Sequence, residues 1–128
     1  MNEISVEELF RMPKSSYELI DIQDEGLTLY GMIPGALHIC FEELQSERCE
    51  KIGEIPSEKK LIFYCQIGRK TRDMDDLACL QGRDCFSLAG GYIGYIRSGL
   101  SGREQQKERQ RKAEESIRKK YHTLLDFR

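Results

Sequence analysis

Apolar side chains form one nearly continuous run in the middle of the chain, KLIFYC at residues 60–65. Strands with apolar residues at successive positions are buried on both faces, as they are at the centre of a parallel sheet. Three shorter β-prone runs occupy residues 17–22, 35–40 and 85–88, and turn-forming residues lie near each of them. The pattern predicts a sheet with the strand at 60–65 near its centre.

Helices are predicted between these strands. Ser5 and Glu8 form a capping box that predicts a helix ending near Met12, before Pro13. Residues 24–31 leave room for a turn or two of helix, and apolar spacing predicts helices at 41–53, 74–81 and 92–97. Strands that alternate with helices across short connections indicate an α/β domain with a mostly parallel sheet. Such sheets bind ligands at the carboxyl ends of their strands.

The length and charge of the chain indicate one domain with a distinct tail. A chain of 128 residues has room for one domain with a core, but not for two ordinary ones. We expect this domain at 1–100 and a charged helical extension at 101–128. Residues 1–100 carry 11 Lys/Arg and 17 Asp/Glu, whereas residues 101–120 carry 8 and 4. The basic residues of 101–120 alternate with acidic ones and lack interleaved aromatic residues, which argues against nucleic acid as a partner.

The far end of the extension carries an apolar stripe at helical spacing: Ile117, Tyr121, Leu124 and Leu125. Most often such a stripe docks on its own domain. The alternative is contact with a second copy, giving a homodimer, or with a partner protein. No apolar run is long enough for a membrane span, and the N-terminus is acidic where a signal peptide would be basic. We therefore expect a soluble cytoplasmic protein without membrane contact.

The five cysteines are odd in number and form no C-x-x-C pair, so neither a disulfide framework nor a zinc site is indicated. Four of them are expected to be small apolar side chains in or near the core: Cys40, Cys49, Cys79 and Cys85. Cys65 differs, because it ends the central apolar run and is followed by Gly68 and then by basic residues.

The segment after Cys65 predicts a nucleophile inside an anion-binding loop. Amide groups of a turn and of the first residues of the next helix converge as a site for negative charge. Gly68 supplies the backbone freedom that a tight turn needs. Arg69, Lys70 and Arg72 would favour the thiolate of Cys65 and attract an anionic substrate.

Five segments, in order, carry a family resemblance: ISVEEL (4–9), LIDIQD (19–24), MIPGA (32–36), CQIGRK (65–70) and LAGGY (88–92). With them the chain resembles the rhodanese family of sulfurtransferase domains over about residues 3–100. CQIGRK matches the family's six-residue active loop, and FYCQIGR (63–69) is similar to rhodanese modules joined to flavin-dependent disulfide reductases. The resemblance implies a five-stranded, mostly parallel sheet with helices on both faces, here with an extra C-terminal helix.

The family's chemistry, carried onto this chain, makes Cys65 the catalytic nucleophile. Its thiolate would take a sulfane sulfur from thiosulfate or a persulfide donor, and a thiol, cyanide or a partner protein would accept it from the Cys65 persulfide. The resemblance implies no metal or cofactor. It places substrate binding in six loop residues: Gln66, Ile67, Gly68, Arg69, Lys70 and Thr71. Which basic side chain points inward stays open.

The sequence leaves alternatives to sulfur transfer by Cys65. A rhodanese fold also serves as a binding or regulatory module without turnover. Cys79 or Cys85 is a candidate resolving thiol, although the placement of both argues for burial. Tyrosine-phosphatase chemistry needs an arginine six residues after the cysteine to hold phosphate through two bonds, and Thr71 stands there instead.

The chain departs from the family pattern at two positions. Gln23 stands where arginine is frequent, and Met32 stands where histidine is usual. Both positions are expected to be structural, although the missing arginine would weaken an ion pair with a carboxylate. Asp21 ends a strand and is expected to hydrogen-bond neighbouring loops rather than to act as a base, and His38 is expected to pack within its strand.

Overall fold

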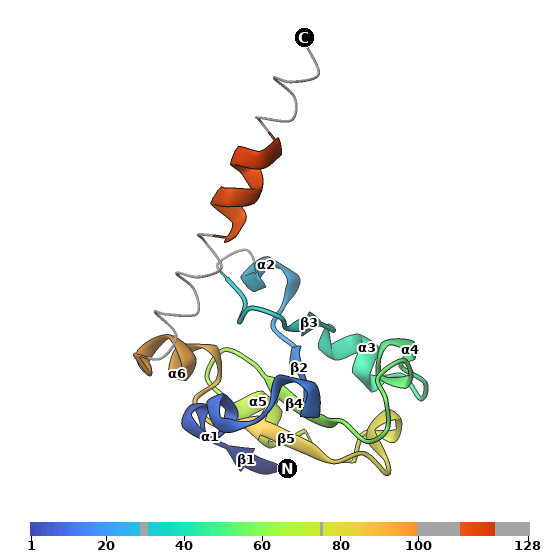
Figure 1. Ribbon diagram of the computed structural model, residues 1–128. Coiled ribbons are helices and arrows are strands. Elements are labelled where there is room, and N and C mark those ends of the chain that lie inside the picture. Colours follow the sequence, from blue (N-terminus) through green and yellow to red (C-terminus); the bar gives the residue numbers. More distant parts are fainter. Residues whose placement is uncertain (29–30, 75, 100–110, 120–128) are drawn as a thin grey trace.

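The computed structural model describes residues 1–28, 31–74, 76–99 and 111–119. Its sheet has five strands in the order β1-β5-β4-β2-β3, and every neighbouring pair is parallel (Figure 1). The strands are β1 (Asn2–Ile4), β2 (Tyr17–Asp21), β3 (Leu37–His38), β4 (Lys60–Tyr64) and β5 (Cys85–Leu88). The predicted α/β class is confirmed, and β4 lies at the centre of the sheet, as its apolar run predicts.

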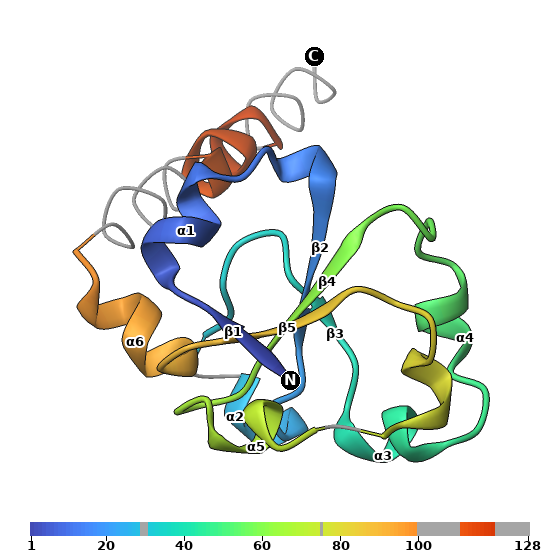
Figure 2. The same ribbon diagram turned by 90° about the horizontal axis from the view of Figure 1, so that it is seen from below.

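Helices cover both faces of this sheet. They are α1 (Val6–Arg11), α2 (Glu25–Thr28), α3 (Phe41–Gln45), α4 (Glu50–Gly53), α5 (Arg69–Arg72) and α6 (Gly91–Arg97), with 3₁₀ turns η1 (Lys14–Ser16) and η2 (Ala78–Leu80). Figure 2 shows α1 and α6 on one side of the sheet and α3 and α4 on the other. The predicted capping box begins α1, because the Glu8 N–H donates to Ser5 Oγ at 3.1 Å and the Ser5 N–H to Glu8 Oε1 at 3.4 Å.

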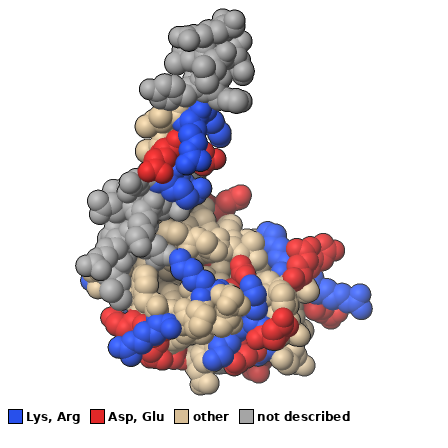
Figure 3. Space-filling model, in the orientation of Figure 1, with Lys and Arg blue, Asp and Glu red and all other residues tan. Residues whose placement is uncertain are grey.

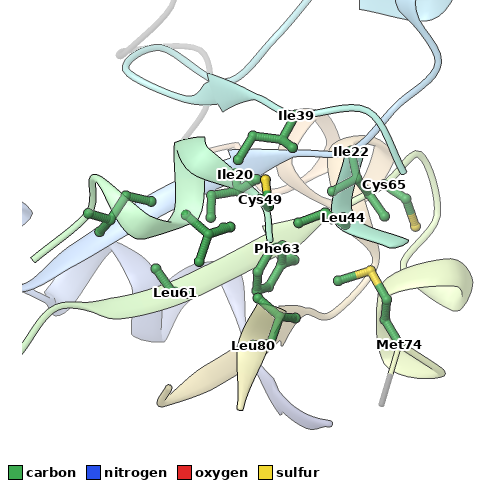
Figure 4. Packing of buried hydrophobic residues seen from close by; sticks show 12 residues of the cluster. Ile20, Ile22, Ile39, Leu44, Cys49, Leu61, Phe63, Cys65, Met74 and Leu80 are labelled. Carbon is green, nitrogen blue, oxygen red and sulfur yellow. The ribbon is translucent and has the colours of Figure 1, made fainter. Parts of the chain in front are cut away.

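Two apolar clusters sandwich the sheet, because successive side chains of β4 point to opposite faces. Leu61 and Phe63 belong to one cluster, and Ile62 and Tyr64 belong to the other. The first cluster packs under α3, α4 and η2, and Figure 4 shows Cys65 and Met74 at one end of it. The second cluster packs under α1 and α6. The four side chains from Leu61 to Tyr64 are fully buried, which fixes the strand that leads into Cys65.

The structure corrects two expectations about local elements and adds one strand. The helix predicted at 41–53 is two short helices, α3 and α4, because the chain leaves helical geometry between Ser46 and Cys49. The helix predicted at 74–81 is wrong, since the described residues of this range form no helix except the 3₁₀ turn η2. The fifth strand is β1, which the sequence pattern did not locate. It pairs with β5 from Asn2↔Phe86 to Ile4↔Leu88.

Residues 111–119 are helical and exposed throughout, and this helix projects away from the sheet in Figure 1. Glu115 forms i,i+4 ion pairs with Arg111 at 3.5 Å and with Lys119 at 4.0 Å. Ile117 is 54% exposed, and the other stripe residues, Tyr121, Leu124 and Leu125, lie outside the described residues. The domain division at residue 100 stays a prediction. No helix in the described part of the chain is long and apolar enough to cross a membrane.

Candidate active site

Cys65 lies at the carboxyl edge of the sheet, directly after β4, where the sequence pattern predicts it. It is 6% exposed. The Gly68 N–H donates a hydrogen bond to Cys65 Sγ at 3.2 Å, and Thr71 Oγ1 lies 3.8 Å from the same sulfur. The sulfur is therefore held by hydrogen-bonding groups of its own loop.

The loop leaves several backbone amides unpaired. The N–H groups of Gln66, Ile67, Arg69 and Lys70 donate no hydrogen bond to any described residue. All four residues are exposed. Successive amides without a protein acceptor form a binding site for water or an anion. The loop thus offers hydrogen-bond donors to an anionic group that approaches the Cys65 sulfur.

The start of α6 fixes the shape of this loop. The Tyr92 N–H donates to the Cys65 carbonyl at 2.9 Å, and the Ile93 N–H donates to the Gln66 carbonyl at 3.0 Å. Gly68 and Gly91 have left-handed φ angles of 87° and 59°. A Cβ at Gly91 would collide with the Cys65 carbonyl oxygen and lie 2.8 Å from Gly68 N. Glycine is required here because two backbone segments touch directly.

A buried pair of hydroxyls lies beneath the sulfur. Thr71 Oγ1 and Ser87 Oγ are 2.6 Å apart, and both residues are fully buried. Thr71 Oγ1 also donates to the Gly68 carbonyl at 3.4 Å. Ser87 comes from β5, the neighbour of β4, and sequence reasoning missed it. Its only signal is a small polar residue inside the apolar run CFSL.

The three basic side chains after Cys65 have different surroundings. Lys70 Nζ lies 4.5 Å from the centroid of the Phe41 ring, and Arg72 Nε pairs with Asp73 Oδ1 at 3.4 Å. The Arg69 side chain has no hydrogen bond or ion pair among the described residues. Of the three basic side chains, Arg69 is therefore the one without a partner among the described residues, and it is exposed.

The helix that directly follows the loop is very short. α5 has 4 residues, from Arg69 to Arg72, so it completes about one turn. The dipole of a single turn is far smaller than that of a full helix. The hydrogen-bond donors next to Cys65 are therefore the loop amides, with little contribution from a helix dipole. On the face shown in Figure 3, Lys and Arg are interspersed with Asp and Glu, so side-chain charge acts locally.

Asp21 and Gln23 hold the end of β2 in place. Asp21 is fully buried and accepts hydrogen bonds from the Gln23 N–H at 2.7 Å and from Gln23 Nε2 at 3.0 Å. The group of the Gln23 side chain that donates to the Asp21 carboxylate is thus a neutral amide. His38 Nε2 lies 2.8 Å from the Gln23 carbonyl, which agrees with the structural roles expected for these residues.

Tyr64 anchors the segment that contains Met32. Its hydroxyl accepts a hydrogen bond from the Ile33 N–H at 3.0 Å. Burial, with the Asp21 carboxylate adding to its effect, raises the pKa of Tyr64 well above its ordinary value. The phenol therefore stays protonated and structural. Met32 is half-buried, and no described contact gives it a role at Cys65.

The other cysteines lie in less reactive surroundings. Cys49 is buried in the core, and Cys79 and Cys85 are half-buried against the same cluster. Burial raises the pKa of Cys79, and it raises that of Cys85 to about 11. Cys40 is half-buried outside both clusters, and its Sγ donates to Glu43 Oε1 at 3.2 Å. Among the described residues, no group of His, Cys, Asp or Glu side chains is placed to hold a metal ion.

Comparisons with known proteins agree with this arrangement. The chain is 28% identical over 103 residues to a protein of Allochromatium vinosum named sulfurtransferase, covering 78% of this chain and 92% of that one. It is 26% identical to the human single-domain sulfurtransferase TSTD1, with a TM-score of 0.61 and coverage of 75% and 96%. Bacillus anthracis CoADR-RHD has the same fold at 23% identity and a TM-score of 0.59, and 74% of this chain matches 16% of that one.

The family model for the Rhodanese-like domain matches residues 5–98. This range includes β2 to β5, the loop after Cys65 and the glycine pair that begins α6. The chain therefore belongs to the Rhodanese-like domain family.

Proposed function

We propose that the protein is a sulfurtransferase that carries a sulfane sulfur on Cys65. The observation that supports this most strongly is the surrounding of the Cys65 sulfur. The sulfur accepts the Gly68 N–H, and four further amides of the loop have no acceptor among the described residues. A terminal persulfide sulfur carries a negative charge, and unpaired amides are suited to bind it. The relative from Allochromatium vinosum and human TSTD1 are both named sulfurtransferases.

The proposed reaction has two displacement steps. In the first, the Cys65 thiolate attacks the outer sulfur of the donor. The S–S bond of the donor breaks, and its electron pair leaves with sulfite from thiosulfate or with a thiolate from a persulfide. In the second, a thiol or cyanide attacks the outer sulfur of Cys65-S-S⁻. The acceptor gains the sulfur, and the Cys65 thiolate is regenerated.

The loop residues have separate roles in this proposal. The amides of residues 66–70 hold the terminal sulfur, and the Arg69 guanidinium attracts the donor. Thr71 supports the Cys65 sulfur from below, where it is fully buried against Ser87. A buried threonine at this position cannot grip a tetrahedral phosphate as an arginine would, which favours sulfur transfer over phosphatase chemistry.

The test is the intact mass of the protein after incubation with thiosulfate or with glutathione persulfide. We expect a gain of about 32 Da, one sulfur, on the peptide that contains Cys65, and thiocyanate release when cyanide is added. Cys65→Ser should lose both signals. Cys85→Ser should keep both, because its half-buried thiol lies in the core cluster rather than in the loop.

The same experiment separates the enzyme from a binding module. A domain without turnover would gain no sulfur from either donor and release no thiocyanate. Sulfur loading that persists in Cys65→Ser would assign the carrier to another cysteine and overturn the proposal. Hydrolysis of p-nitrophenyl phosphate by the wild-type chain would favour the phosphatase reading instead.

A further inference from the structure

Phe41 links α3 to the loop after Cys65. Its ring lies 4.5 Å from Lys70 Nζ, within the range of a cation–π contact. Phe41 itself is half-buried and packs against the core cluster that contains Cys65. The ring therefore has a fixed position, and the exposed Lys70 side chain adapts to it.

This contact lowers the number of basic side chains that the loop offers to a sulfur donor. Arg72 pairs with Asp73, and Lys70 lies on Phe41, so Arg69 alone has no partner among the described residues. A hydropersulfide anion carries one negative charge, whereas thiosulfate carries two. Drawing the Lys70 ammonium toward a second charge would cost the contact with the ring. The arrangement thus suits a singly charged donor better than a doubly charged one.

We infer that Phe41 is a specificity-determining residue, which holds Lys70 and so makes the loop favour singly charged persulfide donors over thiosulfate. The inference rests on the proposed function of Cys65 and adds the class of donor. Phe41 acts through Lys70 and is not assigned contact with the reacting sulfur.

The test compares the rate of sulfur loading on Cys65 from thiosulfate and from 2-hydroxyethyl persulfide, whose anion has a single negative charge, measured by intact mass after rapid quenching. Phe41→Leu keeps an apolar side chain of similar size but removes the ring. We expect it to raise the thiosulfate rate about two- to fivefold relative to the persulfide rate, which is the range that an exposed cation–π contact allows. Phe41→Tyr keeps a ring and should behave as wild type.

Two further variants assign the effect to Lys70. Lys70→Gln alone should change the ratio of the two rates little, because Phe41 already holds the ammonium. The double variant Phe41→Leu/Lys70→Gln should lose the gain seen in Phe41→Leu. A large fall in the thiosulfate rate for Lys70→Gln alone would overturn the inference, since Lys70 would then already serve the donor.

The chain offers a matched control at the other end of the sheet. Lys60 Nζ lies 5.6 Å from the centroid of the Phe86 ring, and Lys60 begins β4, whereas Cys65 follows its end. Phe86→Leu removes a similar contact far from the loop. It should leave the ratio of the two loading rates unchanged. An equal change in Phe86→Leu and Phe41→Leu would show a general effect of lost packing and contradict the inference.

Alkylation of Cys65 tests the charge at the loop without any sulfur transfer. The ratio of its rates with iodoacetate, an anion, and iodoacetamide, a neutral reagent, is read from the Cys65 peptide. It should rise about two- to fivefold in Phe41→Leu and return to the wild-type value in the double variant. If no donor loads the wild-type chain, the proposed function fails, and this ratio still decides whether Phe41 holds Lys70. An unchanged ratio overturns the inference.

Discussion

At the scale of single residues, the hydroxyl pair beneath Cys65 shows how a buried polar group supports the site. Thr71 Oγ1 and Ser87 Oγ lie 2.6 Å apart with no exposure to solvent. Thr71→Val removes one hydroxyl and leaves the other without this partner. We expect it to lower the free energy of unfolding, measured with urea, by about 1–3 kcal/mol. Because Thr71 also lies 3.8 Å from Cys65 Sγ, alkylation of Cys65 should slow as well.

The matched variants are Ser87→Ala and the double variant Thr71→Val/Ser87→Ala. Removal of both hydroxyls leaves neither one unpaired, so the double variant should cost less than the sum of the single variants. Costs that simply add would show that the two hydroxyls do not stabilise each other, against the geometry described above.

Cys85 gives a pH dependence of stability whose sign follows from its surroundings. Burial raises the pKa of Cys85 from an ordinary value of 9.0 to about 11. The folded protein therefore retains the Cys85 proton at pH values where the unfolded chain has lost it. This contribution to stability is fully present below about pH 9 and is lost as the pH rises through about 11.

The measurement is the free energy of unfolding of wild type and Cys85→Ala across this range. As the pH rises from 9 to 11, the free energy of unfolding of wild type should fall relative to that of Cys85→Ala. A difference that stays constant with pH would contradict the assignment. At pH 8 the same raised pKa should make Cys85 alkylate more slowly than Cys65.

How much of the site the sequence predicts depends on how local each contact is. Cys65, Gly68 and Arg69 follow one another in the chain, so their residue types indicate a loop around a nucleophile. Ser87 joins Thr71 only because β5 lies beside β4, with Phe63 opposite Ser87. The contact between Phe41 and Lys70 joins α3 to the loop. Neither pair has a signal in local spacing, since the tertiary fold creates both.

At the scale of elements, the contact between the loop and α6 is the tightest feature of the site. Gly91 has a φ of 59°, and a Cβ there would lie 2.8 Å from Gly68 N and 2.9 Å from the Gln66 carbonyl carbon. We expect Gly91→Ala to cost at least about 1 kcal/mol from the left-handed backbone alone. Collision with the loop should add to this cost and slow sulfur loading on Cys65, measured by intact mass.

Gly53→Ala is the control for this variant. Gly53 ends α4, and no atom lies within 4 Å of the position of its added Cβ. We expect this substitution to leave sulfur loading unchanged and to stabilise the fold by about 0.4–1 kcal/mol, because it restricts the unfolded chain. Equal effects of the two substitutions on Cys65 would refute a specific role for the contact between the loop and α6.

The elements that the sequence predicts are those with strong local signals. The apolar run of β4 and the capping box of α1 each act within a few residues. β1 has three residues, Asn2–Ile4, and exists through its pairing with β5. Met74 and Leu77 have helical spacing, but both pack in or against the core from a segment whose described residues form no α-helix. Burial there follows the tertiary fold rather than helical periodicity.

At the scale of the whole molecule, the two faces of the sheet are covered by different helices. One cluster packs α3, α4 and η2 against the face that bears Cys65, and the other packs α1 and α6. The loop after Cys65 lies where both layers meet, since it touches α6 through Gly91 and α3 through Phe41. A change in either layer can therefore reach the nucleophile.

The C-terminal helix stands apart from this arrangement, and Ile117 tests whether its apolar stripe is covered. Ile117 is 54% exposed, whereas Ile52 of α4 is 2% exposed. Ile117→Ala should leave the free energy of unfolding within about 0.5 kcal/mol of wild type, while Ile52→Ala should cost about 2–5 kcal/mol. A cost at Ile117 that approaches that at Ile52 would show that the stripe is covered in solution. Its dependence on protein concentration would then distinguish a second copy, which binds by mass action, from the chain's own domain, which does not.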